Sequence, residues 1–160
     1  MNIRLFQHGD EDALWSMLEP TFRAGDTYAF PSDCSRESAL NYWLNPTHTV
    51  YICELSALPV GTYLLRPNQS GGGAHVANCG FITAPASRGR GVASAMCRHS
   101  LEAARAGGFK AMQFNFVVST NTGAVRLWEN MGFAIFARLP GAFLHPAKGF
   151  VDALVMFREL

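Results

Sequence analysis

The chain has 160 residues, of which 49% are hydrophobic and 16% are charged, the balance of a folded domain rather than of a disordered segment. Its net charge is +1 and its lysines and arginines form no run, which argues against a nucleic-acid-binding surface. No apolar stretch approaches the roughly 20 residues that cross a bilayer, and the N-terminus turns acidic where a signal peptide needs apolar residues, so we expect a cytoplasmic protein without membrane contact.

The cysteines indicate core packing rather than metal binding. The chain has four of them, with no CxxC pair and no zinc-type spacing, so we expect no metal site. Cys53 and Cys79 lie within apolar runs, and small buried side chains are the usual role of such cysteines.

The first half of the chain predicts a strand, two helices and three further strands. Asp10 is expected to cap a helix that Pro20 ends after Leu18. An aromatic loop then leads to Ser35, which can cap a second helix ending near Asn45-Pro46. Gly80 lies inside a predicted strand, where glycine marks a bulge or a close approach. The expected strands span 1–6, 48–55, 59–66 and 75–83, and the expected helices span 11–18 and 35–44.

The second half predicts two helices that alternate with three strands. A strand over 110–118 places Met112, Phe114 and Phe116 on one face. Asn121 or Thr122 caps the second of these helices. The remaining expected elements are a helix over 91–106, a helix ending at 131–132 and strands over 133–139 and 151–157. This order predicts an α/β domain with a mixed sheet, and no linker or repeat divides residues 1–160, so we expect a single domain.

A glycine-rich turn links a strand to a helix at residues 87–94 (SRGRGVAS). Gly89 and Gly91 allow a tight turn that exposes backbone N–H groups, and the start of the following helix adds unpaired donors that suit an anion. Arg88 and Arg90 add positive charge, so the turn is typical of a pyrophosphate site. It has neither the Gly-Lys-Ser/Thr of a Walker loop nor the third glycine of a dinucleotide-binding turn.

A second motif, Asn121 to Phe133 (NTGAVRLWENMGF), follows the turn after about one strand. The turn resembles the R/Q-x-x-G-x-G/A motif of the GNAT superfamily of N-acetyltransferases at Arg88 to Ala93. The second motif is similar to the later helix of that superfamily, and the element order also agrees. The resemblance covers nearly the whole chain and implies a mostly antiparallel seven-stranded mixed sheet with splayed strands 4 and 5 and about four flanking helices.

The resemblance implies a binding mode for acetyl-CoA between the splayed strands. The backbone of Phe81, Ile82 and Thr83 would pair with the pantetheine arm, and the Phe81 N–H would polarise the thioester carbonyl. The pyrophosphate would lie on the backbone of the turn, and Asn121 would either contact the arm or only cap its helix. The turn residues concerned are Arg88, Gly89, Arg90, Gly91, Val92 and Ala93.

Trp128 stands where many members of the superfamily have a tyrosine that protonates the leaving thiolate. An indole N–H can donate a hydrogen bond but releases no proton near neutral pH. Trp128 is therefore expected to form a wall of the thiol pocket, with a direct contact to the thiolate as the alternative.

A narrower resemblance concerns the acceptor. The segments TFRAGDTYAFP, HVANCGFIT and MQFNFVVSTN are similar to fungal acetyltransferases that act on proline analogues such as azetidine-2-carboxylate. In those enzymes strand asparagines hold the amine and carboxylate of the substrate, which implies that role for Asn78 and Asn115. Thr27 and Tyr28 would belong to the loop over the acceptor. Hydrogen bonds across the strand gap remain the alternative for both asparagines.

We therefore expect an acetyl-CoA-dependent N-acetyltransferase for a small-molecule amine, an amino acid or proline analogue, by direct attack. A xenobiotic amine, a protein N-terminus and a non-catalytic acyl-CoA sensor remain alternatives. No general base is evident, because His75 fits a surface or packing position, and His145 and Lys148 fit solvated loop positions, better than a catalytic role. The superfamily includes many dimers, so the resemblance allows a homodimer.

Overall fold

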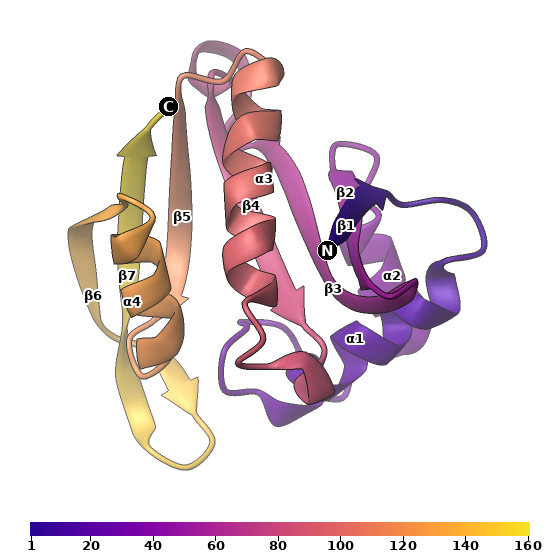
Figure 1. Cartoon of the computed structure of the whole chain (residues 1–160). Coiled ribbons are helices and arrows are strands. Elements are labelled where there is room, and N and C mark those ends of the chain that lie inside the picture. Colours follow the sequence, from indigo (N-terminus) through magenta and orange to yellow (C-terminus); the bar gives the residue numbers. More distant parts are fainter.

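A seven-stranded mixed sheet in the order β1-β2-β3-β4-β5-β7-β6 forms the centre of the computed structural model, which describes residues 1–160 (Figure 1). Only β4 and β5 run parallel, and all other neighbouring strands are antiparallel, which confirms the predicted mixed sheet. The strands are β1 Asn2–Leu5, β2 Thr49–Leu55, β3 Leu58–Pro67, β4 Val76–Thr83, β5 Ala111–Val118, β6 Ala134–His145 and β7 Gly149–Glu159. The helices are α1 Glu11–Ala24, α2 Arg36–Trp43, α3 Val92–Ala106 and α4 Thr122–Asn130, with short 3₁₀ turns at Gly71–Gly73 and Pro85–Ser87.

Helices cover both faces of the sheet and bury a separate apolar core on each. One core joins the sheet to α3 and α4, and the other joins it to α1 and α2. Gly61 of β3 lets α3 approach closely, because an added Cβ would lie 2.9 Å from side-chain atoms of Val92 and Met96. This close packing holds the N-terminus of α3 above the sheet. None of the helices is long and apolar enough to span a membrane.

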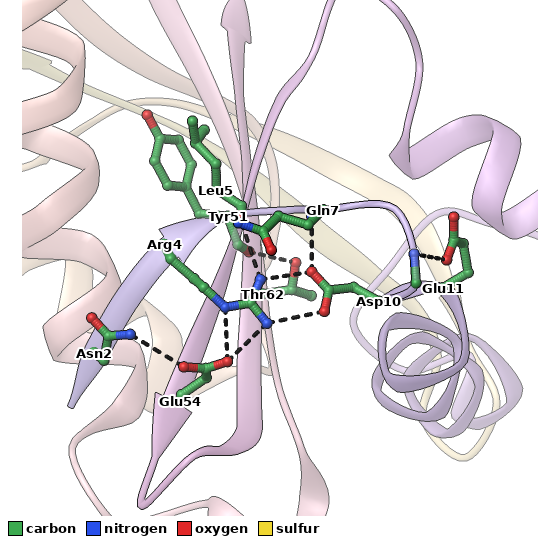
Figure 2. Close-up of polar contacts among 10 residues, drawn as sticks. Asn2, Arg4, Leu5, Gln7, Asp10, Glu11, Tyr51, Glu54 and Thr62 are labelled. Carbon is green, nitrogen blue, oxygen red and sulfur yellow. Dashed lines mark hydrogen bonds and ion pairs between the residues drawn. The ribbon is translucent and has the colours of Figure 1, made fainter.

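Arg4 ties the edge strand β1 to β2 and to the start of α1 (Figure 2). Its guanidinium donates to both carboxylate oxygens of Asp10 at 2.7 and 2.9 Å and to Glu54 at 2.8 Å. The hydrogen bond from Arg4 is the main reason why the pKa of Asp10 is lowered. Asp10 stands at the expected N-cap, but its carboxylate accepts from the Gln7 N–H at 2.8 Å and makes no capping bond to the helix. The predicted cap is thus right in position and wrong in its hydrogen bond.

The prediction that Pro20 ends the first helix is wrong. Helix α1 continues through Pro20 to Ala24 and ends at Gly25, which adopts a left-handed conformation with φ 61°. Proline inside a helix costs about 3 kcal/mol. The extra turn buries Phe22 to 1% exposure, and burying such a side chain gains about 1.5–3 kcal/mol, which offsets about half or more of that cost.

Two further predictions are corrected at the C-terminal side of the sheet. A register shift between Phe114 and Val117 of β5 breaks the predicted alternation, so Phe116 is exposed and Val117 enters the core instead. Phe143 and His145, expected in a loop, lie within β6 and pair with β7. A second register shift, between Leu139 and Phe143, accommodates Pro140 and Gly141 within this strand as a bulge.

Candidate functional site

Strands β4 and β5 separate soon after they meet, and Figure 1 shows them drawing apart towards the bottom of the view. Their pairing is confined to Val76 with Ala111 and Ala77 with Met112. Beyond Ala77, β4 has a partner only on its β3 side. The splay expected from the resemblance is therefore present, and it opens on the carboxyl side of both strands.

The register of β4 shows which backbone groups face this opening. Hydrogen bonds from Asn68 N to Val76 O and from Ala84 N to Val60 O mark the positions at which β4 bonds to β3. Antiparallel pairs alternate between bonded and non-bonded positions, so the even-numbered residues of β4 bond to β3. Cys79, Phe81 and Thr83 then direct their N–H and C=O groups into the opening. The Phe81 N–H has the orientation needed to donate to a carbonyl placed there.

The glycine-rich turn lies between β4 and α3 and carries no obstruction. Gly89 and Gly91 have φ values of 75° and 77°, and no heavy atom lies within 4 Å of where a Cβ would be. Gly91 is the N-cap of α3, and no side chain caps the helix, so its first N–H groups remain available to an anion. Arg88 and Arg90 are exposed and form no ion pair. The donors and the charge of this turn fit a diphosphate.

A cleft of about 960 Å³ joins the turn to the strand opening and brings the predicted site residues together, apart from Arg90. Those that line it are Thr27, Tyr28, Asn78, Phe81, Ile82, Thr83, Arg88, Gly89, Gly91, Val92, Ala93, Asn115, Asn121 and Trp128. His145 also lines the cleft, whereas His75 and Lys148 do not. No group of three or more His, Cys, Asp or Glu residues is placed to hold a metal ion.

Trp128 forms an aromatic wall of the cleft. It is only 7% exposed, and its ring centroid lies 5.0 Å from those of Phe81 and Phe114. Asn121, at the other end of α4, accepts a hydrogen bond from the Ala124 N–H at 3.3 Å. Asn121 therefore caps the helix and also faces the cleft, so the two roles considered for it are compatible.

The two strand asparagines belong to a chain of amides across the strand gap. Asn78 Nδ2 donates to the Gln113 carbonyl at 2.8 Å. Gln113 Nε2 donates to Asn115 Oδ1 at 2.9 Å, and Asn115 Nδ2 donates to Asn68 Oδ1 at 2.7 Å. Both asparagines thus make the cross-gap hydrogen bonds considered as an alternative, and both still line the cleft. Each amide nitrogen retains a second N–H that a ligand could use.

Tyr28 fastens the aromatic loop between α1 and α2 to β4. Its hydroxyl donates to the Phe81 carbonyl at 3.2 Å, and burial raises the pKa of Tyr28. A Cβ at Gly80 would lie 2.9 Å from this hydroxyl, so the glycine marks a close approach and no bulge. The loop therefore closes one end of the cleft beside the group expected to activate the thioester.

Sequence reasoning missed several polar residues of the cleft. Asp26 is the only carboxylate that lines it, and Arg66 and Tyr42 lie on its walls. Asn68 and Gln113 complete the amide chain. Arg66 had a visible signal, a charge at the end of an apolar strand. The others gave none, because Asn68 lies in a polar turn and Asp26 in a mixed loop.

Comparison with known proteins identifies relatives of this chain. A model of the acetyltransferase (GNAT) family matches residues 12–133. The N-acetyltransferase aca1 of Schizosaccharomyces pombe is 33% identical over 97 residues, which cover 60% of this chain and 46% of aca1. The chain therefore spans about half the length of that relative.

Solved structures show the same fold along the chain. A GCN5-related N-acetyltransferase from Kribbella flavida is 37% identical, with a TM-score of 0.94 over 99% of this chain and 97% of that one. The putative acetyltransferase yncA from Salmonella typhimurium, solved with its cofactor acetyl-CoA, is 18% identical, with a TM-score of 0.87 over 100% and 94% of the two chains. At that identity the second likeness concerns the fold alone.

Proposed function

Because the chain belongs to the GNAT acetyltransferase family, we propose that it transfers an acetyl group from acetyl-CoA to the amine of a small molecule. One observation carries this proposal. An uncapped, glycine-rich helix start opens directly onto backbone groups of β4 that pair with no neighbouring strand, within one cleft. A diphosphate and an extended amide-bearing arm need these two features side by side.

The cofactor half of the cleft would act mainly through its backbone. The N–H groups from Arg88 to Ala93 would bind the diphosphate, and Phe81 to Thr83 would pair with the pantetheine arm. The Phe81 N–H would donate to the thioester oxygen as negative charge develops on it, which lowers the barrier to attack. Trp128 would pack against the thiol end of the arm.

In the reaction, the free amine attacks the thioester carbon, the N–C bond forms and the C–S bond breaks. The amine loses its proton to water or a nearby group, and the thiolate leaves as the anion or takes a proton from water, because Trp128 supplies none. Asn78 and Asn115 would orient the acceptor, and positioning of this kind can contribute several kcal/mol. Direct attack needs no covalent enzyme intermediate.

The acceptor that we propose is an amino acid or a proline analogue. The loop carrying Thr27 and Tyr28 closes one end of the cleft, which supports a small acceptor over a peptide. The strand amides that line the cleft suit a substrate with both an amine and a carboxylate. A xenobiotic amine and a protein N-terminus would use the same chemistry but would not need these amides.

Thiol release from acetyl-CoA across a panel of amines tests the proposal. We expect turnover with small amino acids and their cyclic analogues and little with a peptide N-terminus. Binding of acetyl-CoA without turnover of any amine would instead indicate a sensor module. A Gly91→Val variant, which places a side chain at a φ of 77° in the phosphate turn, should lose both binding and turnover.

We also propose a homodimer that forms through the β6–β7 hairpin. Phe136, Leu144 and Phe150 of this hairpin are large apolar side chains that are 70%, 63% and 77% exposed, and Leu144 faces Phe150 in the β6–β7 register. Light scattering should give twice the chain mass, and Phe136→Lys with Phe150→Lys should reduce it to the monomer value.

All four cysteines are unpaired, which supports our proposal of a reducing compartment such as the cytoplasm. All seven strands belong to one mixed sheet, which supports our proposal of a single domain.

A further inference from the structure

Arg66 lies at the acceptor end of the cleft, in a strand that carries no part of the cofactor motifs. It faces Asn78 directly in the β3–β4 register, so the two side chains project from the same face of the sheet. Arg66 and Asn78 both line the cleft. The guanidinium therefore belongs to the same wall as the strand amides.

No negative group of the protein compensates the charge of Arg66. The side chain is half-buried, yet it takes part in none of the ion pairs or side-chain hydrogen bonds of the chain. The charge of Arg66 acts on His48, whose pKa is lowered by burial and also by that charge. A histidine carries either a positive charge or none, so His48 gives Arg66 no counter-charge. A partly buried cation without a partner is unfavourable, and an anionic ligand would remove that penalty.

The neighbouring amides cannot replace this cation as the main anchor for an anion. Asn78 and Asn115 already hold Gln113 and Asn68, which fixes their orientation. All five N–H donors of Arg66 are uncommitted, and the planar guanidinium matches the two oxygens of a carboxylate.

The charges and the dimensions of the cleft define the ligand further. Asp26, its only carboxylate, makes no ion pair with Arg66, so opposite charges face the cleft without neutralising each other. Phe81 lies three residues along β4 from Asn78, a separation of about 10 Å. A short amino acid can place its carboxylate at Arg66 and its amine towards the thioester held by the Phe81 N–H. A molecule whose carboxylate is far from its amine could not place both groups at these positions.

We infer that Arg66 binds the carboxylate of an α-amino or α-imino acid acceptor and thereby selects it over amines without a carboxylate. This inference rests on the proposed acetyltransferase function and assigns the substrate class of the same site. Arg66 acts as a specificity residue and takes no part in bond making.

The experiment compares azetidine-2-carboxylate with azetidine, which differ only in the carboxylate. Wild type should acetylate the acid with the higher kcat/KM. Arg66→Gln should lower kcat/KM for the acid by about 10- to 100-fold, the value of a charged hydrogen-bonded pair, and should change that for azetidine little. Arg66→Lys should retain part of the kcat/KM for the acid, since an ammonium keeps the positive charge but lacks the planar pair of N–H donors that matches a carboxylate. Arg105→Gln, at the exposed C-terminal end of α3, is the matched control and should change neither value.

Equal losses for both acceptors, or no loss in Arg66→Gln, would overturn the inference and leave the acetyltransferase proposal standing. Absence of thiol release from wild type with every amine would overturn the proposed function instead.

Calorimetric titration of the CoA-loaded proteins with azetidine-2-carboxylate tests Arg66 without turnover. Weaker binding by Arg66→Gln than by wild type supports the inference, and equal or absent binding in both overturns it.

Discussion

Asn115→Ala separates the structural role of this asparagine from a role in holding the acceptor. The change removes the hydrogen bonds to Gln113 Nε2 at 2.9 Å and to Asn68 Oδ1 at 2.7 Å. Gln113→Ala is the matched control, because it removes the first of these bonds from the other side. It also keeps the Gln113 backbone carbonyl that Asn78 uses.

The expected loss of stability follows from the number of hydrogen bonds removed. Each contributes about 0.5–1.5 kcal/mol net, so Asn115→Ala should lower the free energy of unfolding by about 1–3 kcal/mol, and Gln113→Ala by about half of that. For a chain of this size, 1 kcal/mol corresponds to about 2–4 °C in Tm. Thermal unfolding should therefore show a fall of about 2–12 °C for Asn115→Ala and a smaller fall for the control.

Steady-state thiol release shows whether the amide also contacts the acceptor. If it does, kcat/KM for azetidine-2-carboxylate should fall by about 10-fold more in Asn115→Ala than in Gln113→Ala, the worth of a hydrogen bond to a charged group. The Kd for acetyl-CoA should stay near that of wild type in both variants. Parallel losses in the two variants, or a matching loss of acetyl-CoA affinity in Asn115→Ala, would refute a role in acceptor binding.

Three further predictions concern the cofactor turn, the aromatic wall and the edge strand. Gly91→Ala should weaken acetyl-CoA binding in calorimetry by about 10-fold, because its φ of 77° strains any side chain by about 1–2 kcal/mol, whereas Gly72→Ala, outside the cleft, should leave binding unchanged. Trp128→Phe should keep kcat within a few-fold of wild type, since the indole supplies no proton, and a far larger loss in stopped-flow thiol release would contradict this. The pKa of Asp10 is lowered mainly by Arg4, so its contribution to stability is present above about pH 4 and is lost as the pH falls through the lower folded value. Urea midpoints should therefore fall more between pH 7 and pH 3 in wild type than in Arg4→Gln, and equal falls would count against the ion pair.

Local rules predicted the fold wherever they and the packing agreed. Ser35 caps α2 as expected, and its hydroxyl accepts from the Ser38 N–H at 3.1 Å. The rules failed where packing outweighed them. Pro20 stays inside α1 because the turn beyond it buries Phe22, and Gly141 stays inside a strand because a bulge admits it. Neither outcome follows from the residue type alone, because the stabilising contacts come from outside the element: Phe22 packs on Phe30 and Trp43, and the Gly141 N–H donates to Asp152 at 3.0 Å.

The candidate site likewise has one part that the sequence predicts, the phosphate turn, and one part that it does not predict, the acceptor end. The phosphate turn depends on consecutive backbone geometry, so a short motif containing Gly89 and Gly91 was enough to predict it. The acceptor end depends on side chains from three strands and a loop. Arg66 and Asn115 line one cleft, and Asn68 meets Asn115, only through the register of the sheet and the bulge in β5. Their spacing in the sequence carries no sign of this.

This division bears on how acceptor choice can change within the fold. If main-chain groups hold the acetyl donor, most substitutions in the cofactor half affect it only where they strain the turn or block it, as at Gly91. The acceptor would be chosen by a few side chains, and Arg66 can change without removing any hydrogen bond made within the protein. Asn115 cannot, because its amide also joins Gln113 to Asn68. Substitution at Arg66 should therefore alter specificity at little cost in stability, whereas substitution at Asn115 should alter both together.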